Sequence, residues 1–186
     1  MKTLHPHPSA CRALLRIATA PFFAALFLIG GCASPPMQEA MVPTGVVISK
    51  KHPETVRLNV GGGADAAAGT TVPNAALEAA LNQAINESKL FSQVVKGNGG
   101  DFILTANVFS VNQPMFGMAM KVKMEVGWTL KRASDDKTVW QEAIRSEHTS
   151  TPGEAFAGVT HVRLATEGAV KNNIAEAMSK LATLSL

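Results

Sequence analysis

The sequence lacks the excess of positive charge that nucleic-acid binding requires. Its formal net charge is +3, from 17 Lys and Arg residues against 14 Asp and Glu residues. Lys2, Arg12 and Arg16 fall within the first 31 positions, so the remaining 14 basic and 14 acidic residues balance. This balance leaves no electrostatic footprint for a phosphate backbone. A disordered chain is also excluded, because 46% of the residues are apolar and only 17% are charged.

The N-terminal hydrophobic run is too short to span a membrane. Residues 17–29 (IATAPFFAALFLI) are apolar apart from Thr19 and Pro21. As a helix this run would extend about 20 Å, less than the ~30 Å hydrocarbon core of a bilayer. It follows a basic segment without acidic residues and precedes Gly30 and Gly31. This order of basic, apolar and small residues predicts a cleavable export signal over residues 1–31.

The end of this signal resembles a known family motif. Leu28-Ile29-Gly30-Gly31-Cys32 is similar to the lipobox of Gram-negative bacterial lipoproteins, in which an aliphatic residue and two small residues precede a cysteine. The resemblance implies that Cys32 is the mature N-terminus and carries acyl chains such as palmitate. Ala33-Ser34 follows in place of aspartate, which implies a lipid anchor in the outer membrane with the protein facing the periplasm. The alternative is an ordinary secretory signal beside an unrelated cysteine.

Cysteine is scarce in this chain. Cys11 and Cys32 are the two cysteines, and Cys11 lies in the segment that processing would remove. The mature chain therefore cannot form an internal disulfide, although an exported protein meets an oxidising environment. A lone cysteine at the mature N-terminus is better explained by lipid attachment than by redox chemistry. Stable anchoring requires more than one acyl chain.

Residues 32–54 are expected to be the lipidated N-terminus and a flexible tether, because the segment contains four prolines and no hydrophobic period. A single domain is expected over residues 55–186. Strict alternation predicts a strand over 55–60, and a helix is expected from Pro73-Asn74 onward. A short strand is expected within 88–96. The apolar stripe of the helix consists of Leu77, Leu81 and Ile85, with Ala80 and Ala84 beside them.

Three further strands follow in the pattern of the sequence. Residues 101–111 are apolar on both faces, which is typical of a central strand. Residues 117–131 are apolar at every second position, and residues 137–149 are expected to return as the antiparallel partner through a loop at 134–136. In this register three residue pairs lie opposite one another: Glu125 and Arg145, Lys123 and Glu147, Leu130 and Trp140. Trp128 and Trp140 then share the inner face with Glu142, which is expected near the rim of the sheet.

A C-terminal helix completes the domain. Thr151-Pro152-Gly153-Glu154 has the pattern of a capping box with proline at the first helical position. Val170, Ile174, Ala177, Met178 and Leu181 then recur at helical spacing. The predicted order is β-α-β-β-β-α, an α+β fold with a mostly antiparallel sheet of about four strands and two helices on one face. This outline resembles that of several small outer-membrane lipoproteins, including the lipopolysaccharide-assembly lipoprotein.

Catalytic and cofactor motifs are weak in the mature chain. Gly61 to Ala66 formally fits G-x-G-x-x-A, but Gly69 and Pro73 would interrupt the helix that a dinucleotide loop needs. The three mature histidines, His52, His148 and His161, form no H-E-x-x-H pattern, and G-x-S-x-G is absent. Asp135-Asp136 is interpreted as a solvated hairpin tip.

A run of methionines is the one candidate metal site. Met115, Met118, Met120 and Met124 are thioethers, which favour Cu(I). Met118, Met120 and Met124 nevertheless share the alternating face of a strand with Val122, Val126 and Trp128, where methionine is an ordinary core residue. We therefore expect no metal, no cofactor other than the lipid on Cys32, and no nucleic acid.

These observations favour a non-enzymatic binding or assembly module of the cell envelope. The expected partners are the membrane, through the lipid anchor, and another envelope protein or component, through an edge of the sheet. Two alternatives stay open: a carrier or sensor of a small apolar ligand held between sheet and helices, and an envelope enzyme. A deep apolar cavity would favour the carrier, whereas an exposed strand edge would favour the binding module.

Overall fold

The structure is a computed structural model that describes residues 36–62, 72–113, 119–151, 153–154 and 158–186. The described residues belong to one compact unit, Ala33–Leu186. Its elements run in the order α1, β1, α2, β2, β3, β4, β5, α3. Their bounds are α1 Gln38–Met41, β1 His52–Gly61, α2 Asn74–Ser88, β2 Phe91–Val95, β3 Phe102–Asn112, β4 Met120–Arg132, β5 Thr138–Ser150 and α3 Gly158–Leu181.

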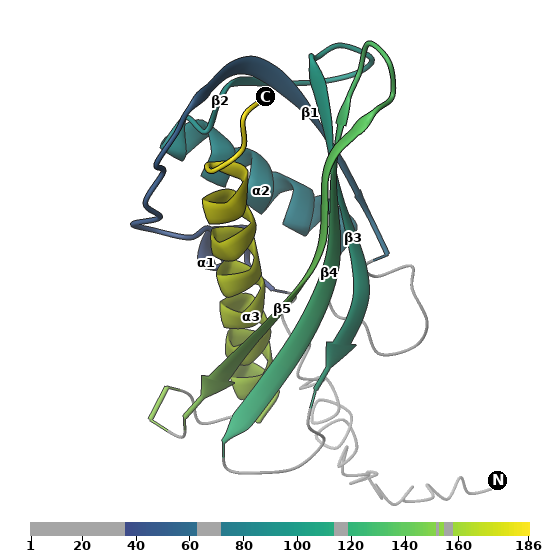
Figure 1. The fold of residues 1–186 in the computed structure, drawn as a ribbon. Coiled ribbons are helices and arrows are strands. Elements are labelled where there is room, and N and C mark those ends of the chain that lie inside the picture. The colour runs from purple at the N-terminus through teal and green to yellow at the C-terminus, as the bar shows by residue number, and fades with distance from the viewer. Residues whose placement is uncertain (1–35, 63–71, 114–118, 152, 155–157) are drawn as a thin grey trace, which may run out of the picture. The chain divides into compact units, whose positions relative to one another are not determined.

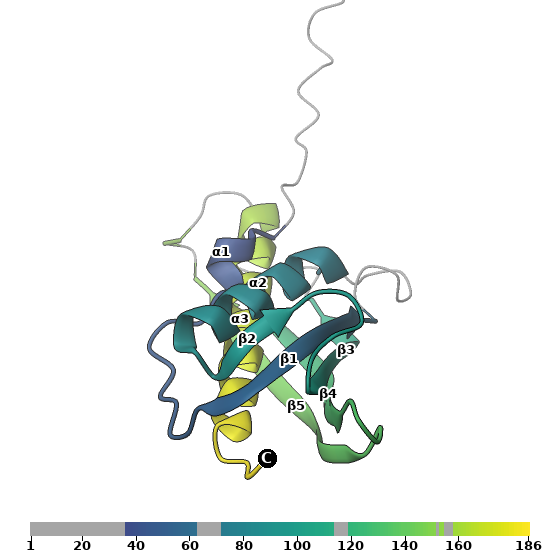
Figure 2. The ribbon, with the colours of Figure 1, turned by 90° about the horizontal axis from the view of Figure 1, so that it is seen from above.

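The predicted α+β class is confirmed, with five strands in one mixed sheet of order β2-β1-β3-β4-β5. The two long ladders, β3 with β4 and β4 with β5, are antiparallel. Strand β1 pairs in parallel with both β2 and β3. Parallel pairing fits the connection through α2, since parallel strands need a crossover that is usually a helix. Figures 1 and 2 show α2 and α3 on the same side of this sheet.

The hairpin of β4 and β5 has the predicted register. Glu125 lies opposite Arg145, Lys123 opposite Glu147, and Leu130 opposite Trp140. Alternation places the apolar residues of β4 inward, and these are the most buried residues of the strand: Met120, Val122, Met124, Val126, Trp128 and Leu130. Such alternation sets the register strongly, because a one-residue slip would turn every apolar side chain outward.

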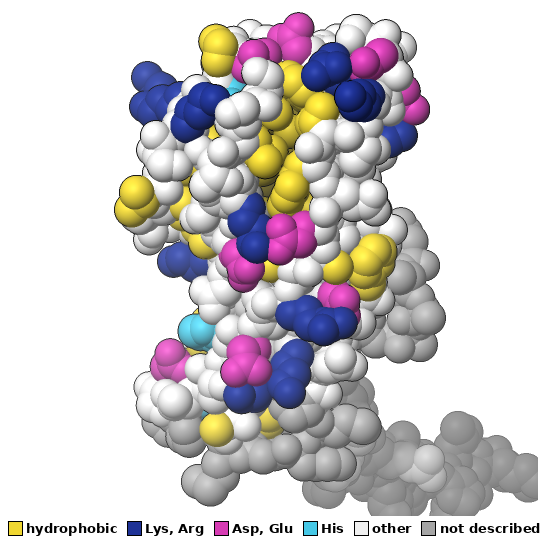
Figure 3. Space-filling view, viewed as in Figure 1, with side chains coloured by type: hydrophobic (Ala, Val, Ile, Leu, Met, Phe, Trp, Pro, Cys, Tyr) yellow, Lys and Arg dark blue, Asp and Glu magenta, His cyan; other side chains and the backbone are white. Residues whose placement is uncertain are grey.

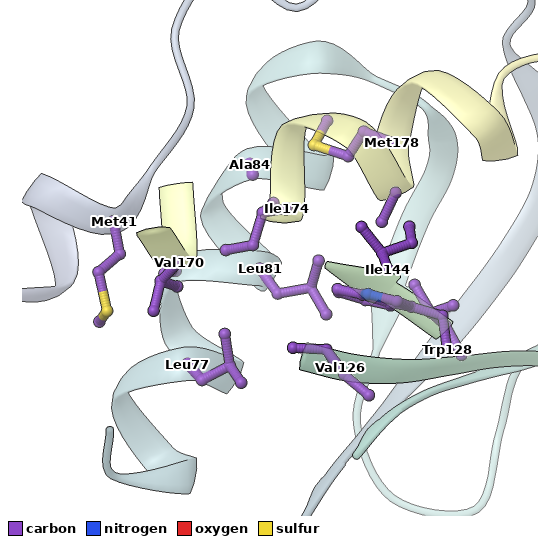
Figure 4. Packing of buried hydrophobic residues seen from close by; sticks show 14 of the residues in the cluster. Met41, Leu77, Leu81, Ala84, Val126, Trp128, Ile144, Val170, Ile174 and Met178 are labelled. Carbon is purple, nitrogen blue, oxygen red and sulfur yellow. The ribbon is translucent and has the colours of Figure 1, made fainter. Parts of the chain in front are cut away.

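The core lies between the sheet and the two long helices. The predicted stripe of α2 and the predicted apolar residues of α3 are all buried, with at most 2% of each residue exposed. Trp128 lies at the centre of this core, where Figure 4 shows it beside Val126 and Ile144. Its indole Nε1 donates a hydrogen bond of 2.9 Å to Oδ1 of Asn173 on α3. This buried polar pair is satisfied and fixes the position of α3 against the sheet.

Part of the segment expected to be a tether packs on the domain. Helix α1 contacts α2 and α3, and Met41 and Val42 are buried in the core. Strand β1 begins at His52, three residues before the predicted domain start. The sequence pattern could not show this, because two adjacent apolar residues have no period, yet burying them is favourable. Within the described residues, no helix is both long and apolar enough to cross a membrane.

Candidate functional site: the free edge of the sheet and an adjoining apolar hollow

The structure separates the three histidines that the sequence singles out. His52 is buried at the start of β1, with its Nε2 2.9 Å from the carbonyl oxygen of Leu181. His161 on α3 lies 3.3 Å through its Nδ1 from the hydroxyl of Ser150. His148 packs against Gly168 of α3, where an added Cβ would overlap its ring. Each histidine therefore has a separate packing role, and no three His, Cys, Asp or Glu side chains among the described residues could hold a metal ion.

The other sequence candidates are only partly within the described residues. Cys32 lies outside them, as do Met115 and Met118, so these predictions stay untested. Met120 and Met124 are 8% and 2% exposed and face the core. The described part of the glycine loop is Gly61 and Gly62; Gly62 has a φ of +74° and lies against the backbone of Val108. A side chain at position 62 would clash there, which accounts for this glycine without a ligand.

Asp135 and Asp136 form the predicted hairpin tip. Asp135 Oδ1 accepts a hydrogen bond from the backbone N–H of Lys137 at 3.2 Å, and Arg132 pairs with its other oxygen at 3.1 Å. The Lys137 N–H is the main cause that lowers the pKa of Asp135, and the hydrogen bond from Arg132 adds to it. Asp136 pairs with Lys131 at 3.1 Å. These contacts stabilise a turn and leave no paired-carboxylate site.

Strand β5 is the long edge strand, and its second half is covered by α3. The side-chain amide of Asn173 donates to the carbonyl oxygen of Ile144, and that of Asn172 donates to the carbonyl oxygen of Glu147, both at 2.9 Å. The hydroxyl of Ser146 donates to the carbonyl oxygen of Ala169 at 2.8 Å. The two amides thus bond to backbone carbonyl groups of β5, and all three contacts hold its second half against α3.

The first half of β5 has no such cover from described side chains. Its pairing with β4 shifts between Trp140 and Thr138, so Val139 is an extra residue in a bulge. Bulges are common at sheet edges, where they end or redirect pairing. The uncovered stretch is therefore Trp140–Ala143, which we call the free edge. It is shorter than the edge expected from the sequence, because the amides of α3 cap the rest.

An apolar hollow adjoins the free edge. Figure 3 shows hydrophobic side chains at the surface between α3 and β5, in the upper half of that view. Val139 and Trp140 of β5 are half-buried apolar residues packed against the core, as are Leu184 and Leu186 of the C-terminal tail. Trp140 faces inward opposite Leu130, yet part of it remains accessible to solvent. Trp140 is thus a partly accessible tryptophan at an open strand edge, and tryptophan is a residue type enriched at binding hot spots.

An ion-pair cluster lies beside the free edge. Lys180 of α3 pairs with Glu142 of β5 and, at 3.8 Å, with Glu176. The hydrogen bond to Glu142 is the main cause that raises the pKa of Lys180 above its ordinary value. Glu142 is on the inner face, as expected, and its 38% exposed side chain lies at the rim. The ion pair with Lys180 compensates the charge of Glu142 on an otherwise apolar face. The charged side chains of the cluster also border the hollow.

Sequence reasoning missed this site because its parts come from three separated segments. The free edge could be predicted from the hairpin, but the capping amides of Asn172 and Asn173 could not be matched to it. Their one signal is that two adjacent amides interrupt the apolar spacing of the C-terminal helix. Polar residues at a helix–sheet boundary are generally hydrogen-bonded when buried.

Comparisons with known proteins identify the fold but no family. No protein-family model matches the chain, and no curated protein matches its sequence. Among solved structures, protein XCC0632 of Xanthomonas campestris, assigned to the DUF330 model, has a TM-score of 0.58 at 14% identity, covering 79% of this chain and 91% of that one. A candidate lipoprotein from Caulobacter crescentus CB15 has a TM-score of 0.50 at 14% identity, covering 78% and 92%.

A third solved structure is the hypothetical protein CT253 of Chlamydia trachomatis. It has a TM-score of 0.50 at 9% identity and covers 69% of this chain and 98% of that one. Identities this low establish a shared fold and nothing more. At that level the comparisons agree with what the order of elements predicts: the domain shares its fold with a candidate lipoprotein of Caulobacter crescentus.

Proposed function

We propose that this chain is a lipid-anchored protein of the bacterial cell envelope whose domain binds another envelope component without catalysing a reaction. The lipobox-like segment ending at Cys32 supports the anchor. The Ala33-Ser34 pair that follows supports the outer membrane, with the domain facing the periplasm. A fold shared with a candidate envelope lipoprotein agrees with this placement.

The free edge, with its partly exposed Trp140, is the observation on which the binding role depends. An extended segment of a partner can add to an open strand edge, where main-chain hydrogen bonds give affinity and a pocket for a side chain gives specificity. Both parts are present here, because the free edge adjoins the apolar hollow. Tryptophan is enriched among residues that dominate binding energies. The partner is therefore expected to present a short extended segment with an apolar side chain.

Four other hollows formed by described residues do not have the lining of a carrier site. Their volumes are about 300 to 510 Å³, and each has at least one charged side chain in its lining. The largest is lined by Glu54, Asp101 and Arg132, among others. Pockets for apolar ligands are instead lined predominantly by hydrophobic and aromatic side chains.

Site-specific photo-crosslinking in cells tests the proposal. A photoreactive residue at Gln141, an exposed position in the free edge, should give a discrete crosslinked product. The same residue at Lys123, exposed on β4 away from the edge, should give none. The substitution Trp140→Leu keeps the site apolar but removes the large ring, so it should weaken the crosslink from position 141 severalfold.

Two outcomes would contradict the proposal. Equal products from positions 141 and 123 would mean that the captured protein is a neighbour without a defined contact. No product at position 141, from protein that fractionates with membranes, would exclude the free edge as the binding surface. Mass spectrometry of the product identifies the partner and the partner segment that reaches the edge.

A further inference from the structure

The segment between the predicted lipid and β1 is fastened to the domain at both ends. We call residues 37–51 the N-terminal strap. Near its start the side-chain amide of Gln38 donates to Gln83 of α2 at 3.1 Å. Its middle is held by Met41 and Val42 in the core. Near its end the hydroxyl of Ser49 donates to the carbonyl oxygen of Ala182 at 2.9 Å.

A buried carboxylate holds the first residue of the strap. Glu167 of α3 is 2% exposed, and its Oε1 accepts a hydrogen bond of 2.8 Å from the backbone N–H of Met37. Arg163, one helical turn earlier, donates to the same oxygen at 2.9 Å. Its other oxygen, Oε2, is buried without a hydrogen-bond partner among the described residues. A buried charge costs free energy unless it is paired. Loss of either hydrogen bond to Glu167 would therefore be unfavourable.

The short distance along the chain from Cys32 to Met37 limits where a membrane can lie. Five residue-to-residue steps join these positions, and a fully extended chain spans at most about 3.6 Å per step, or roughly 18 Å in total. A lipid on Cys32 must therefore lie within that distance of the point where Glu167 holds the strap. A free tether over residues 32–54 would have allowed several times this reach.

We propose that the surface around the start of the strap, formed by α1 and the first half of α3, faces the phospholipid bilayer in a fixed orientation. This inference rests on the proposed lipidation of Cys32. The occupant of the surface is the bilayer to which the lipid belongs, because the chain that joins them is too short to let the domain turn freely. Met37, whose side chain is 52% exposed, places an apolar group at this surface.

The same geometry holds the hairpin tip away from the membrane. We call the hydrogen bond between Glu167 and the Met37 N–H the clamp. Ser146 of β5 bonds to Ala169, two residues from Glu167, so this part of β5 lies level with the clamp. Ser134 is twelve residues further along the hairpin, and a strand rises about 3.3 Å per residue, so the tip lies some 30 to 40 Å away. Trp140 lies about halfway between Ser146 and the hairpin tip. At that distance from the membrane, the free edge can contact a partner beyond the lipid headgroups.

Energy transfer from single labelled positions to a headgroup dye tests this orientation. The processed chain, with its lipid, is reconstituted in phosphatidylethanolamine–phosphatidylglycerol vesicles that contain an acceptor on the headgroup. An introduced cysteine is then the single free thiol, because Cys32 is acylated and Cys11 is removed. Transfer should be severalfold stronger from Glu39→Cys on α1 than from Ser134→Cys at the hairpin tip. Equal transfer, or stronger transfer from position 134, would overturn the orientation.

Two variants test whether the clamp sets the orientation. Glu167→Ala should reduce the difference between positions 39 and 134, whereas Glu176→Gln, an exposed position on the same helix, should leave it unchanged. Should Glu167→Ala unfold the domain, a flexible glycine–serine insertion between Cys32 and Met37 should abolish the difference instead. A difference that survives the insertion would overturn the role of the short connection.

Intact-mass measurement separates the two ways in which the inference can fail. A chain without acyl groups contradicts the anchoring under the proposed function and the orientation with it. A fully acylated chain that transfers equally from both positions contradicts the orientation alone and leaves the anchor in place.

Discussion

Asp101, directly before β3, links strand β1 to the hairpin of β4 and β5. Its carboxylate accepts hydrogen bonds from the backbone N–H and the hydroxyl of Thr55 on β1, both at 2.8 Å. Its carbonyl oxygen accepts from the N–H of Ala133 in the hairpin at 2.8 Å. The N–H of Thr55 is the main cause that lowers the pKa of Asp101 from its ordinary value of 3.8, and the Thr55 hydroxyl adds to it.

The substitution Asp101→Asn should therefore destabilise the domain in a pH-dependent way. Because the folded pKa is depressed, the charge contributes stability above pH 3.8, and this contribution is lost as the pH falls through the folded pKa. Urea unfolding at pH 7 should show the variant to be less stable than the wild type, and the gap should narrow near pH 3.

Asp136→Asn at the hairpin tip is the matched control. Its ion pair with Lys131 is exposed, so its removal should change the free energy of unfolding by less than about 1 kcal/mol. Asp136 has a φ of +56°, which asparagine tolerates well. A gap between wild type and Asp101→Asn that stays constant from pH 7 to pH 3 would refute the assignment.

Gly168 illustrates how far residue-scale prediction reaches. In the sequence it is a residue that weakens a helix by about 1 kcal/mol relative to alanine. In the structure it provides the space into which the ring of His148 packs. The spacing of the helix could be predicted, because periodicity is local. The pairing of position 168 with position 148 could not, because it depends on how α3 crosses β5.

At the scale of elements, the hairpin was the most predictable part of the fold. Alternation, opposite charges and a short loop all specify one register, and β4 and β5 have it. The ion pairs differ in detail: Arg145 pairs with Glu125 at 3.1 Å, whereas Glu147 pairs with Lys121 at 2.8 Å rather than with Lys123 directly opposite. The parallel partners of β1 and the packing of α1 were not predictable, because non-neighbouring segments form them.

Two adjacent positions on β4 test the face assignment. Met124 is 2% exposed, so Met124→Lys places an unpaired charge in the core and should cost more than about 4 kcal/mol, enough to unfold the domain. Lys123 is exposed on the other face, so Lys123→Glu should cost less than about 1 kcal/mol. Thermal melts of the two variants measure the difference, and the reverse ranking would refute the assignment.

At the scale of the whole molecule, the proposed lipid on Cys32 would determine where the domain works. The substitution Cys32→Ser removes the thiol that the lipobox resemblance assigns to the acyl chains. We expect the variant either to be released from membranes or to remain as an unprocessed precursor. Fractionation and intact-mass measurement of membrane-extracted protein distinguish these results. Wild-type protein with an unmodified Cys32 in the membrane fraction would contradict the lipoprotein assignment.

The placement of the tryptophans has a practical consequence. The chain contains two tryptophans and no tyrosine, so its near-ultraviolet fluorescence comes almost entirely from Trp128 and Trp140. Trp128 is fully buried, with its indole N–H bonded to Asn173, and its emission should report only whether the core is intact. Trp140 belongs to the free edge, and its emission should shift to the blue when a partner excludes water. The native protein thus contains one optical probe of folding and another of binding.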